Sequence, residues 1–259
     1  MDKYWIKRMA KAQQNATSIG IKEINKQVAK YYNTASKRLI ADFKLVLATV
    51  LSQADEGKQI TPALLYQLDD YWKLQTQVKQ ELEKLGNKER ALYIKRFEQQ
   101  FFKIYELTSM PGEKSFTTLQ KENVVQMINQ VWCADGKAWS QRIWDNVDKL
   151  ALTLNEELIH CAVAGKTTKE LTDLLQERFN VSFNQADTLV RTEMAHIQTQ
   201  ASQQRYKDYG IKEVKVLVDP DERTCPICAK YEGKRYPVNA VMPVPFHPKC
   251  RCCMVPVVE

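Results

Sequence analysis

The chain has 259 residues, ample for a hydrophobic core, and carries 38 Lys and Arg against 31 Asp and Glu, a net charge of +7. Its richest apolar stretch, residues 45–51, is far shorter than the ~18 residues of a membrane span, and residues 1–8 contain no apolar signal-peptide core. We therefore expect a protein that stays in the cytoplasm or in an assembly built there, has no membrane segment, and has a basic excess that suits nucleic acid or an acidic protein surface.

The first half of the chain predicts helices. Apolar residues recur at helical intervals over residues 4–54, which predicts one or two long helices. Thr61 and Pro62 are typical of a helix start, the first as cap and the second as the first helical residue. The sequence Leu-Gly-Asn at residues 85–87 predicts a break, followed by a helix over about residues 88–107. Residues 110–114, Met-Pro-Gly-Glu-Lys, predict a linker at the end of an N-terminal domain.

The second half remains helical until residue 210 and then changes period. Residues 118–133 and 139–164 predict helices, and Gly165 ends the second. Thr167 and Glu170 form a capping box, and Asn184 predicts the start of a further helix that ends at Gly210. Residues 214–218, 234–238 and 253–258 predict three short strands. We predict an α+β fold, predominantly α-helical, with an N-terminal helical domain (1–112), a second helical part (113–210) and a small zinc-stapled antiparallel β unit (211–259).

The last thirty-five residues contain a Cys/His cluster with metal-ligand spacing. Cys225 and Cys228 form a Cys-x-x-Cys pair, and His247, Cys250 and Cys252 follow after an eighteen-residue spacer. Zinc prefers four sulfur or nitrogen ligands in a tetrahedron, and a full set of protein ligands is typical of a structural site. Cys225 and Cys228 supply one pair. The other pair is either His247 with Cys250 or Cys250 with Cys252, whereas Cys253 points to the opposite side of an extended chain.

Two other interpretations of the cysteines are weaker. A disulfide framework requires an oxidising compartment, which the absence of a signal sequence and the odd count of seven cysteines disfavour. A redox Cys-x-x-Cys normally follows a strand and opens a helix in a thioredoxin-like unit, whereas Pro and Gly surround this motif. Cys133 and Cys161 lie upstream in predicted helices, where we expect small buried side chains.

A polar triplet, Arg191-Thr192-Glu193, occupies the middle of the helix that leads into the β unit. Helical spacing puts Glu193 on or beside the apolar face, where a carboxylate needs a partner. The candidate partners are Asp219, Asp221 and Arg223, which precede the first zinc cysteine. A buried ion pair that docks the helix on the β unit is the favoured interpretation over a catalytic pair. His160 and His196 have no cysteine neighbours and are expected to be surface or satisfied core residues.

The order of these motifs resembles the phage head-morphogenesis family, the minor head (minor capsid) proteins similar to protein F of phage Mu. The resemblance rests on Trp-Ser-Gln-Arg-Ile at 139–143, Leu-Val-Arg-Thr-Glu at 189–193, and Arg-Thr-Cys-Pro-Ile-Cys at 223–228. It is completed by His-Pro-Lys-Cys-Arg-Cys at 247–252 and extends over roughly residues 139–257. The Cys/His positions match the family's signature, as do Arg191, Thr192, Glu193, Asp219 and Arg223.

The resemblance implies a non-enzymatic virion component in the phage head interior or at the portal vertex, made in the host cytoplasm during assembly. It implies the portal protein and the major capsid or scaffold protein as partners, with packaged DNA as a further one, and a role in head morphogenesis, DNA packaging or ejection. It supplies no catalytic residue. Two alternatives stay open: a zinc-stapled nucleic-acid-binding module that uses the basic and aromatic residues of the β unit, and an enzyme that uses Glu193.

Overall fold

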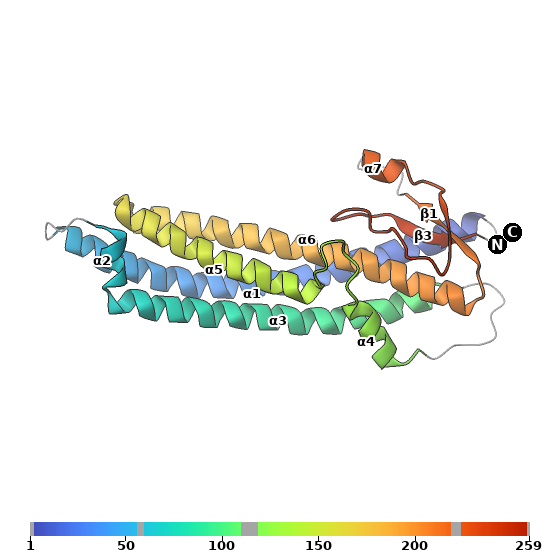
Figure 1. The fold of residues 1–259 in the computed structure, drawn as a ribbon, viewed down its shortest axis with the longest axis horizontal. Coiled ribbons are helices and arrows are strands. Elements are labelled where there is room, and N and C mark those ends of the chain that lie inside the picture. The colour runs from blue at the N-terminus through green and yellow to red at the C-terminus, as the bar shows by residue number, and fades with distance from the viewer. Residues whose placement is uncertain (1–2, 56–59, 110–118, 219–223, 258–259) are drawn as a thin grey trace. The chain divides into compact units, whose positions relative to one another are not determined.

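The protein is predominantly helical with a small sheet near its C-terminus, as predicted (Figure 1). The computed structural model describes residues 3–55, 60–109, 119–218 and 224–257. Its helices are α1 (Lys3–Asp55), α2 (Pro62–Tyr66), α3 (Asp69–Leu107), α4 (Lys121–Asn129), α5 (Trp139–Val163), α6 (Thr168–Asp208) and α7 (Pro226–Ala229). Its strands are β1 (Glu213–Leu217), β2 (Arg235–Pro237) and β3 (Cys253–Pro256).

Contacts divide the chain into two compact units, each assembled from separate stretches of sequence. Unit 1 comprises residues 1–25, 92–139 and 188–259, and unit 2 comprises residues 26–91 and 140–187. The predicted domains 1–112, 113–210 and 211–259 are continuous segments of the chain, whereas each contact unit combines several segments. The units therefore do not test the predicted domain boundaries, which stay a prediction.

Unit 2 is built from segments of α1, α3, α5 and α6, which run side by side in Figure 1, together with α2. Its apolar faces meet in a core with almost no solvent exposure. A buried polar junction links three of the helices: the Asn146 amide of α5 donates to the Tyr32 hydroxyl of α1 at 2.9 Å and to the Ser182 carbonyl of α6 at 3.0 Å. Fully buried side chains of this core include Val28, Leu39, Phe43, Leu47, Leu154 and Leu175.

The predicted break at residues 85–87 is wrong, because α3 continues through Gly86 without interruption. The glycine serves helix packing. A Cβ atom at Gly86 would lie 2.7 Å from Cζ3 of Trp144 on α5 and within 3.2 Å of two further atoms of the same ring. The small residue therefore lets an indole ring pack directly against the α3 backbone, and this contact outweighs the low helix propensity of glycine.

We expect Gly86→Leu to destabilise the protein by about 2 kcal/mol. Overpacking against the Trp144 ring costs up to about 3 kcal/mol, and the better helix propensity of leucine returns about 1 kcal/mol. Thermal unfolding would show a melting temperature lower by roughly 4–8 °C. Ala91→Leu, at an exposed position of the same helix, is the matched control. Equal melting temperatures for the two variants would contradict the packing role of Gly86.

Most of the other helix boundaries follow local signals, although α4 ends at Asn129, four residues before the predicted end at residue 133. Thr61 caps α2 through its Oγ1, which accepts from Leu64 N at 3.4 Å, and the Thr167–Glu170 capping box forms reciprocally ahead of α6. Gly165 and Gly210 have positive φ just beyond the ends of α5 and α6. The predicted helix start at Asn184 is wrong, because Asn184 lies inside α6. Phe179, Ala186 and Val190 keep one buried face through this region, so tertiary packing overrides the capping preference of asparagine.

Unit 1 carries the sheet, which Figure 1 shows beside the start of α1 and the last turns of α6. The strand order is β2-β1-β3, and both pairings are antiparallel, with Val214 opposite Tyr236 of β2 and Pro256 of β3. All three predicted strands form: β2 and β3 lie within their predicted ranges, and β1 begins one residue before its predicted range of 214–218. Residues 110–114, predicted as a linker, lie outside the described residues.

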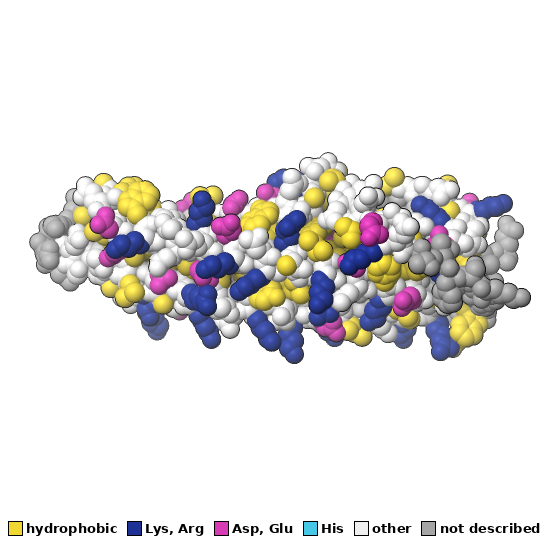
Figure 2. Space-filling view, turned by 90° about the horizontal axis from the view of Figure 1, so that it is seen from below, with side chains coloured by type: hydrophobic (Ala, Val, Ile, Leu, Met, Phe, Trp, Pro, Cys, Tyr) yellow, Lys and Arg dark blue, Asp and Glu magenta, His cyan; other side chains and the backbone are white. Residues whose placement is uncertain are grey.

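Apolar surface in the described part of the chain is dispersed. On the face drawn in Figure 2, hydrophobic side chains alternate with charged ones. No helix among the described residues combines the length and the hydropathy that a membrane crossing requires.

Candidate metal centre

Cys225 and Cys228 are brought together by one short helical turn. Cys225 is the N-cap of α7, Pro226 is its first residue, and Cys228 N donates to Cys225 Sγ at 3.4 Å. Proline is favoured at this position because its fixed φ fits the helix and the missing N–H has no helical partner there. The turn points both sulfur atoms in one direction, as a Cys-x-x-Cys ligand pair requires.

The second half of the cluster is a tight turn from His247 to Cys250. Cys250 N donates to the His247 carbonyl at 3.1 Å, and Lys249 has a φ of 62°. Helix α6 supports the turn from outside, because Lys249 N donates to Thr192 Oγ1 at 3.2 Å. The hydroxyl of the Arg-Thr-Glu triplet therefore holds the backbone directly before Cys250.

The ligand atoms lie at separations that suit a tetrahedral metal ion. His247 Nε2 is 3.2 Å from Cys225 Sγ and 3.1 Å from Cys228 Sγ, and Cys228 Sγ is 3.7 Å from Cys250 Sγ. Zinc–ligand bonds of ~2.0–2.3 Å give tetrahedral edges of roughly 3.4–3.8 Å. The sulfur–sulfur separation lies within this range, and the two nitrogen–sulfur separations are a few tenths of an ångström shorter. All seven cysteines are free thiols, and a sulfur separation of 3.7 Å is much longer than a disulfide bond.

Two groups of three ligands share Cys228. One group is Cys225, Cys228 and His247, the other is Cys228, Cys250 and Cys252, and within each group the ligand atoms lie within 4.8 Å of one another. These are the five residues singled out from the sequence, and together they could hold a metal ion. The second pair of a four-ligand set stays open between His247 with Cys250 and Cys250 with Cys252.

The His247 ring is oriented for ligation through Nε2. Its Nδ1 lies 2.8 Å from the Pro248 carbonyl oxygen, which can only accept, so Nδ1 carries the hydrogen and Nε2 of the neutral ring keeps its lone pair. A backbone carbonyl that fixes the tautomer of a histidine is a usual companion of metal sites.

The thiols differ in acidity because their surroundings differ. The Cys250 sulfur accepts a hydrogen bond from Cys252, which lowers the pKa of Cys250 to about 5, and the same contact raises the pKa of Cys252. Burial raises the pKa of Cys228 to about 12. Cys225 receives the Cys228 N–H, which lowers the pKa of Cys225. A metal ion would replace these shared protons, because coordination deprotonates thiols outright.

The cluster belongs to the core of the sheet. Cys228, Cys250 and Cys252 are buried in one hydrophobic cluster with residues of α1, α6, β1, β3 and the loop after β2. These residues include Met9, Tyr206, Val214, Val216, Val244 and Met254. Cys253 faces the other way and packs with Ile6, Ala10 and Val255. A metal ion here would therefore lie at the margin of this core, with Cys225 and His247 half-buried, and would join the two loops to the sheet.

The ion-pair candidates are only partly within the described residues. Glu193 is buried, with 3% of its surface exposed, whereas Arg191 of the same helix is exposed. Asp219, Asp221 and Arg223 lie outside the described residues, so the proposed pairing stays a prediction. Glu193 Oε2 accepts from Trp132 Nε1 at 3.1 Å.

Trp132 contacts both Glu193 and His196, and nothing in the sequence indicates these contacts. Its indole stacks on the His196 ring, with centroids 4.2 Å apart and planes 11° from parallel. Both ring nitrogens of His196 are buried without a hydrogen-bond partner among the described residues, so His196 is neither a surface residue nor a satisfied core residue. Burial lowers the pKa of His196 to about 4.

His160 is exposed, as expected. Cys161 is buried as predicted, whereas Cys133 lies in a bend outside any helix and is half-buried.

Further polar contacts dock the sheet loops on α6 and α1. Gln203 Nε2 donates to the carbonyls of Val238 at 2.6 Å and Ala240 at 2.9 Å, and Tyr206 Oη donates to the Met254 carbonyl at 3.3 Å. Gln14 of α1 donates to the Arg251 carbonyl at 3.4 Å, between Cys250 and Cys252. No sequence signal distinguishes these glutamines from ordinary helix residues.

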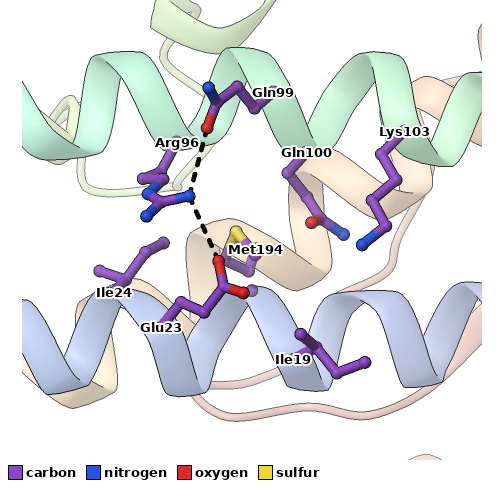
Figure 3. Close-up of a pocket in the computed structure, with 9 residues that line it drawn as sticks. Ile19, Glu23, Ile24, Arg96, Gln99, Gln100, Lys103 and Met194 are labelled. Carbon is purple, nitrogen blue, oxygen red and sulfur yellow. Dashed lines mark hydrogen bonds and ion pairs between the residues drawn. The ribbon is translucent and has the colours of Figure 1, made fainter.

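A pocket of about 170 Å³ in unit 1 lies beside Gly20, with α1, α3 and α6 contributing to its wall (Figure 3). Arg96 crosses its opening, because Arg96 Nη1 donates to Glu23 Oε2 at 3.2 Å and to Gln99 Oε1 at 3.4 Å. A Cβ atom at Gly20 would lie 2.6 Å from Met194 Cε, so the glycine permits close helix packing here. The pocket is smaller than the ~300–1,000 Å³ of typical ligand sites, and we assign it no function.

Comparison with known proteins gives a family match for one segment of the chain. Residues 153–255 match the family model described as Phage Mu protein F like protein, which confirms the predicted resemblance to the phage head-morphogenesis family over this segment. The match covers the end of α5, all of α6, the sheet and the Cys/His cluster, and it begins later than the predicted residue 139. No curated protein and no solved structure matches the chain.

Proposed function

From the match of residues 153–255 to the phage Mu protein F like family, we propose that this chain is a minor head (minor capsid) protein of a tailed phage or prophage. Its role is structural: it supports head morphogenesis near the portal, with DNA packaging or ejection as the later steps it serves. Its partners are the portal protein and the major capsid or scaffold protein, and its location is the virion, after assembly in the host cytoplasm. The family match is the observation that carries the proposal.

The Cys/His cluster is proposed to hold a structural Zn²⁺. Three observations support zinc: four sulfur and one nitrogen ligand atoms lie in two groups that share Cys228, the separation of Cys228 Sγ and Cys250 Sγ fits a tetrahedral edge, and three of the five ligands are buried in the core of the sheet. A sheet with strands of three to five residues has little apolar area of its own, and a metal is a usual means of stabilising such a unit. The ion would bind Cys225 and Cys228 with one of the two remaining pairs.

An enzymatic role for Glu193 has no support in its contacts. A carboxylate that accepts an indole N–H from Trp132 and is almost fully buried serves as an acceptor within the helical core. We propose that the chain is not an enzyme. Nuclease assays that compare the wild type with Glu193→Ala test this, and a metal-dependent activity lost in the variant would refute it.

Quantitative mass spectrometry of purified particles, compared with empty procapsids from the same source, tests the proposed function. We expect a few copies of the chain per particle in both samples, because a portal-proximal component is incorporated during head assembly. Absence of the chain from both samples would refute a virion role. Its presence in procapsids alone would refute a role after packaging while retaining one in assembly.

A further inference from the structure

The net positive charge of the chain resides in α1. This helix contains ten Lys and Arg against three Asp and Glu, an excess of seven, and the whole chain has 38 against 31, the same excess. The remainder of the sequence is therefore electrically balanced. Figure 2 shows the dark blue Lys and Arg side chains projecting from the molecule.

Four lysines of α1 in unit 2 form a straight row, which we call the lysine row: Lys26, Lys30, Lys37 and Lys44. With 3.6 residues per turn, spacings of four, seven and seven residues keep the four side chains within about 40° around the helix axis. The row extends over 18 residues, roughly 27 Å of helix. All four side chains are exposed.

The lysine row has no acidic counterpart in the described part of the chain. Three exposed lysines on other helices are paired: Lys73 with Asp70 and Lys84 with Glu81, both at 3.0 Å, and Lys121 with Glu98, also at 3.0 Å. Arg38 of α1, which lies on a different side of the helix, pairs with Glu81 at 3.2 Å. None of the four row lysines has a carboxylate within 4.0 Å among the described residues. Their charges are therefore available to an external partner.

We propose that the lysine row binds the phosphate backbone of double-stranded DNA. This inference rests on the proposed function, because it assigns a site to the DNA partner named there. Lysine is a flexible point charge that contacts phosphates without reading sequence. A row of ~27 Å corresponds to about eight base pairs of duplex at 3.4 Å per pair, which is long enough for each lysine to reach a different phosphate.

The surroundings of the row favour a phosphate backbone over a protein. A protein interface needs an apolar centre, but the exposed neighbours on this side of α1 are mainly polar: Gln27, Asn33 and Thr34. The exposed large apolar side chains nearest the row lie beyond its two ends: Leu45, with 69% of its surface exposed, and Ile19, with 50%.

The sheet is a poorer DNA site than the sequence indicated. Tyr231, predicted to stack on bases, already stacks on Phe246 with centroids 4.2 Å apart, and Lys234 Nζ lies 4.4 Å from the centre of its ring. Arg235, another candidate for phosphate contact, forms an ion pair with Glu213 at 3.7 Å. Tyr231, Lys234 and Arg235 therefore already contact other side chains of the protein, whereas the four lysines of the row have no carboxylate partner among the described residues.

The test compares two full-length variants of equal charge. The row variant carries Lys30→Gln, Lys37→Gln and Lys44→Gln, and the control carries Lys73→Gln, Lys84→Gln and Lys121→Gln. Glutamine has nearly the helix propensity of lysine, so both variants are expected to fold, which circular dichroism checks. Binding to a short random-sequence duplex is measured by fluorescence anisotropy over a salt series.

We expect the row variant to bind DNA at least about tenfold more weakly than the wild type at low salt. The magnitude of the slope of log K against log salt should fall by about 2 to 3, because each lost phosphate contact removes ~0.9 from it. The control should stay within about twofold of the wild type. Equal losses in both variants, no DNA binding by the wild type, or equally strong salt-sensitive binding to polyglutamate would each overturn the proposal. The assay needs no virion, so absence of the chain from particles would refute the proposed function while this result stands separately.

Discussion

Replacing Cys228 with serine is expected to abolish zinc binding and to unfold the C-terminal sheet. Cys228 is the one residue common to both ligand groups, so every four-ligand set loses a sulfur when it is replaced. Structural zinc contributes on the order of 10 kcal/mol to the folding of small zinc domains, and that free energy disappears with the site. Metal analysis of the purified protein should fall from about one zinc per chain to nearly none.

Cys253→Ser is the matched control for this experiment. Cys253 is as deeply buried as Cys228 and lies next to Cys252, but its side chain packs with Ile6 and Ala10 on the other side of the strand. We expect this variant to keep its zinc and its protease-resistant C-terminal segment, while limited proteolysis cuts Cys228→Ser within residues 211–259. A wild-type protein that contains no zinc, or a Cys228→Ser variant with an unchanged digestion pattern, would contradict the structural metal.

Acid should weaken the protein through His196. Burial lowers the pKa of His196 from 6.5 to about 4, so the folded protein takes up its proton only at lower pH than the unfolded chain does. The stabilisation is complete above pH ~6.5 and is lost as the pH falls through about 4, because in this window the unfolded state binds more protons. A difference of this size corresponds to roughly 3 kcal/mol of unfolding free energy.

Denaturant unfolding at several pH values in this window measures the effect. His196→Phe keeps an aromatic ring on Trp132 and removes the titration, so its stability should fall by about 3 kcal/mol less than that of the wild type between pH 6.5 and 4. His160→Phe, at an exposed position, should follow the wild type. Any acid sensitivity of the metal centre is common to all three proteins and cancels in the comparison. Parallel curves for the wild type and His196→Phe would show that His196 is not the origin of the pH dependence.

The Cys/His cluster could be predicted from the sequence because its information is local. The spacing in Cys225-x-x-Cys228 fixes a turn that presents two sulfur atoms, and the turn from His247 to Cys250 presents the next ligands, so only the meeting of two loops had to be inferred. The strands and most helix ends were predictable for the same reason, since alternation, caps and glycines act over a few residues.

Contacts between distant elements were not predictable in this way. The sequence Leu-Gly-Asn at residues 85–87 is typical of a helix break. The helix continues because the Trp144 ring of α5 packs against the backbone at Gly86. Asn184 has the chemistry of a cap, yet the buried face of α6 passes through it. Trp132 comes from a loop between α4 and α5, and nothing in its neighbours indicates that its indole reaches Glu193 and His196. Each of these errors arises where tertiary packing outweighs a local preference.

The packing of Ile6 and Ala10 against Cys253 and Val255 has a consequence for how the protein is made. These partners are separated by more than 240 residues, so the start of α1 leaves the ribosome roughly 12 to 50 s before β3 is synthesised. During this time the apolar face of α1 that contains Ile6 and Ala10 is not covered by β3. Nascent chains stalled before residue 250 are expected to recruit a chaperone to this helix, and chains extended through residue 257 are expected to release it.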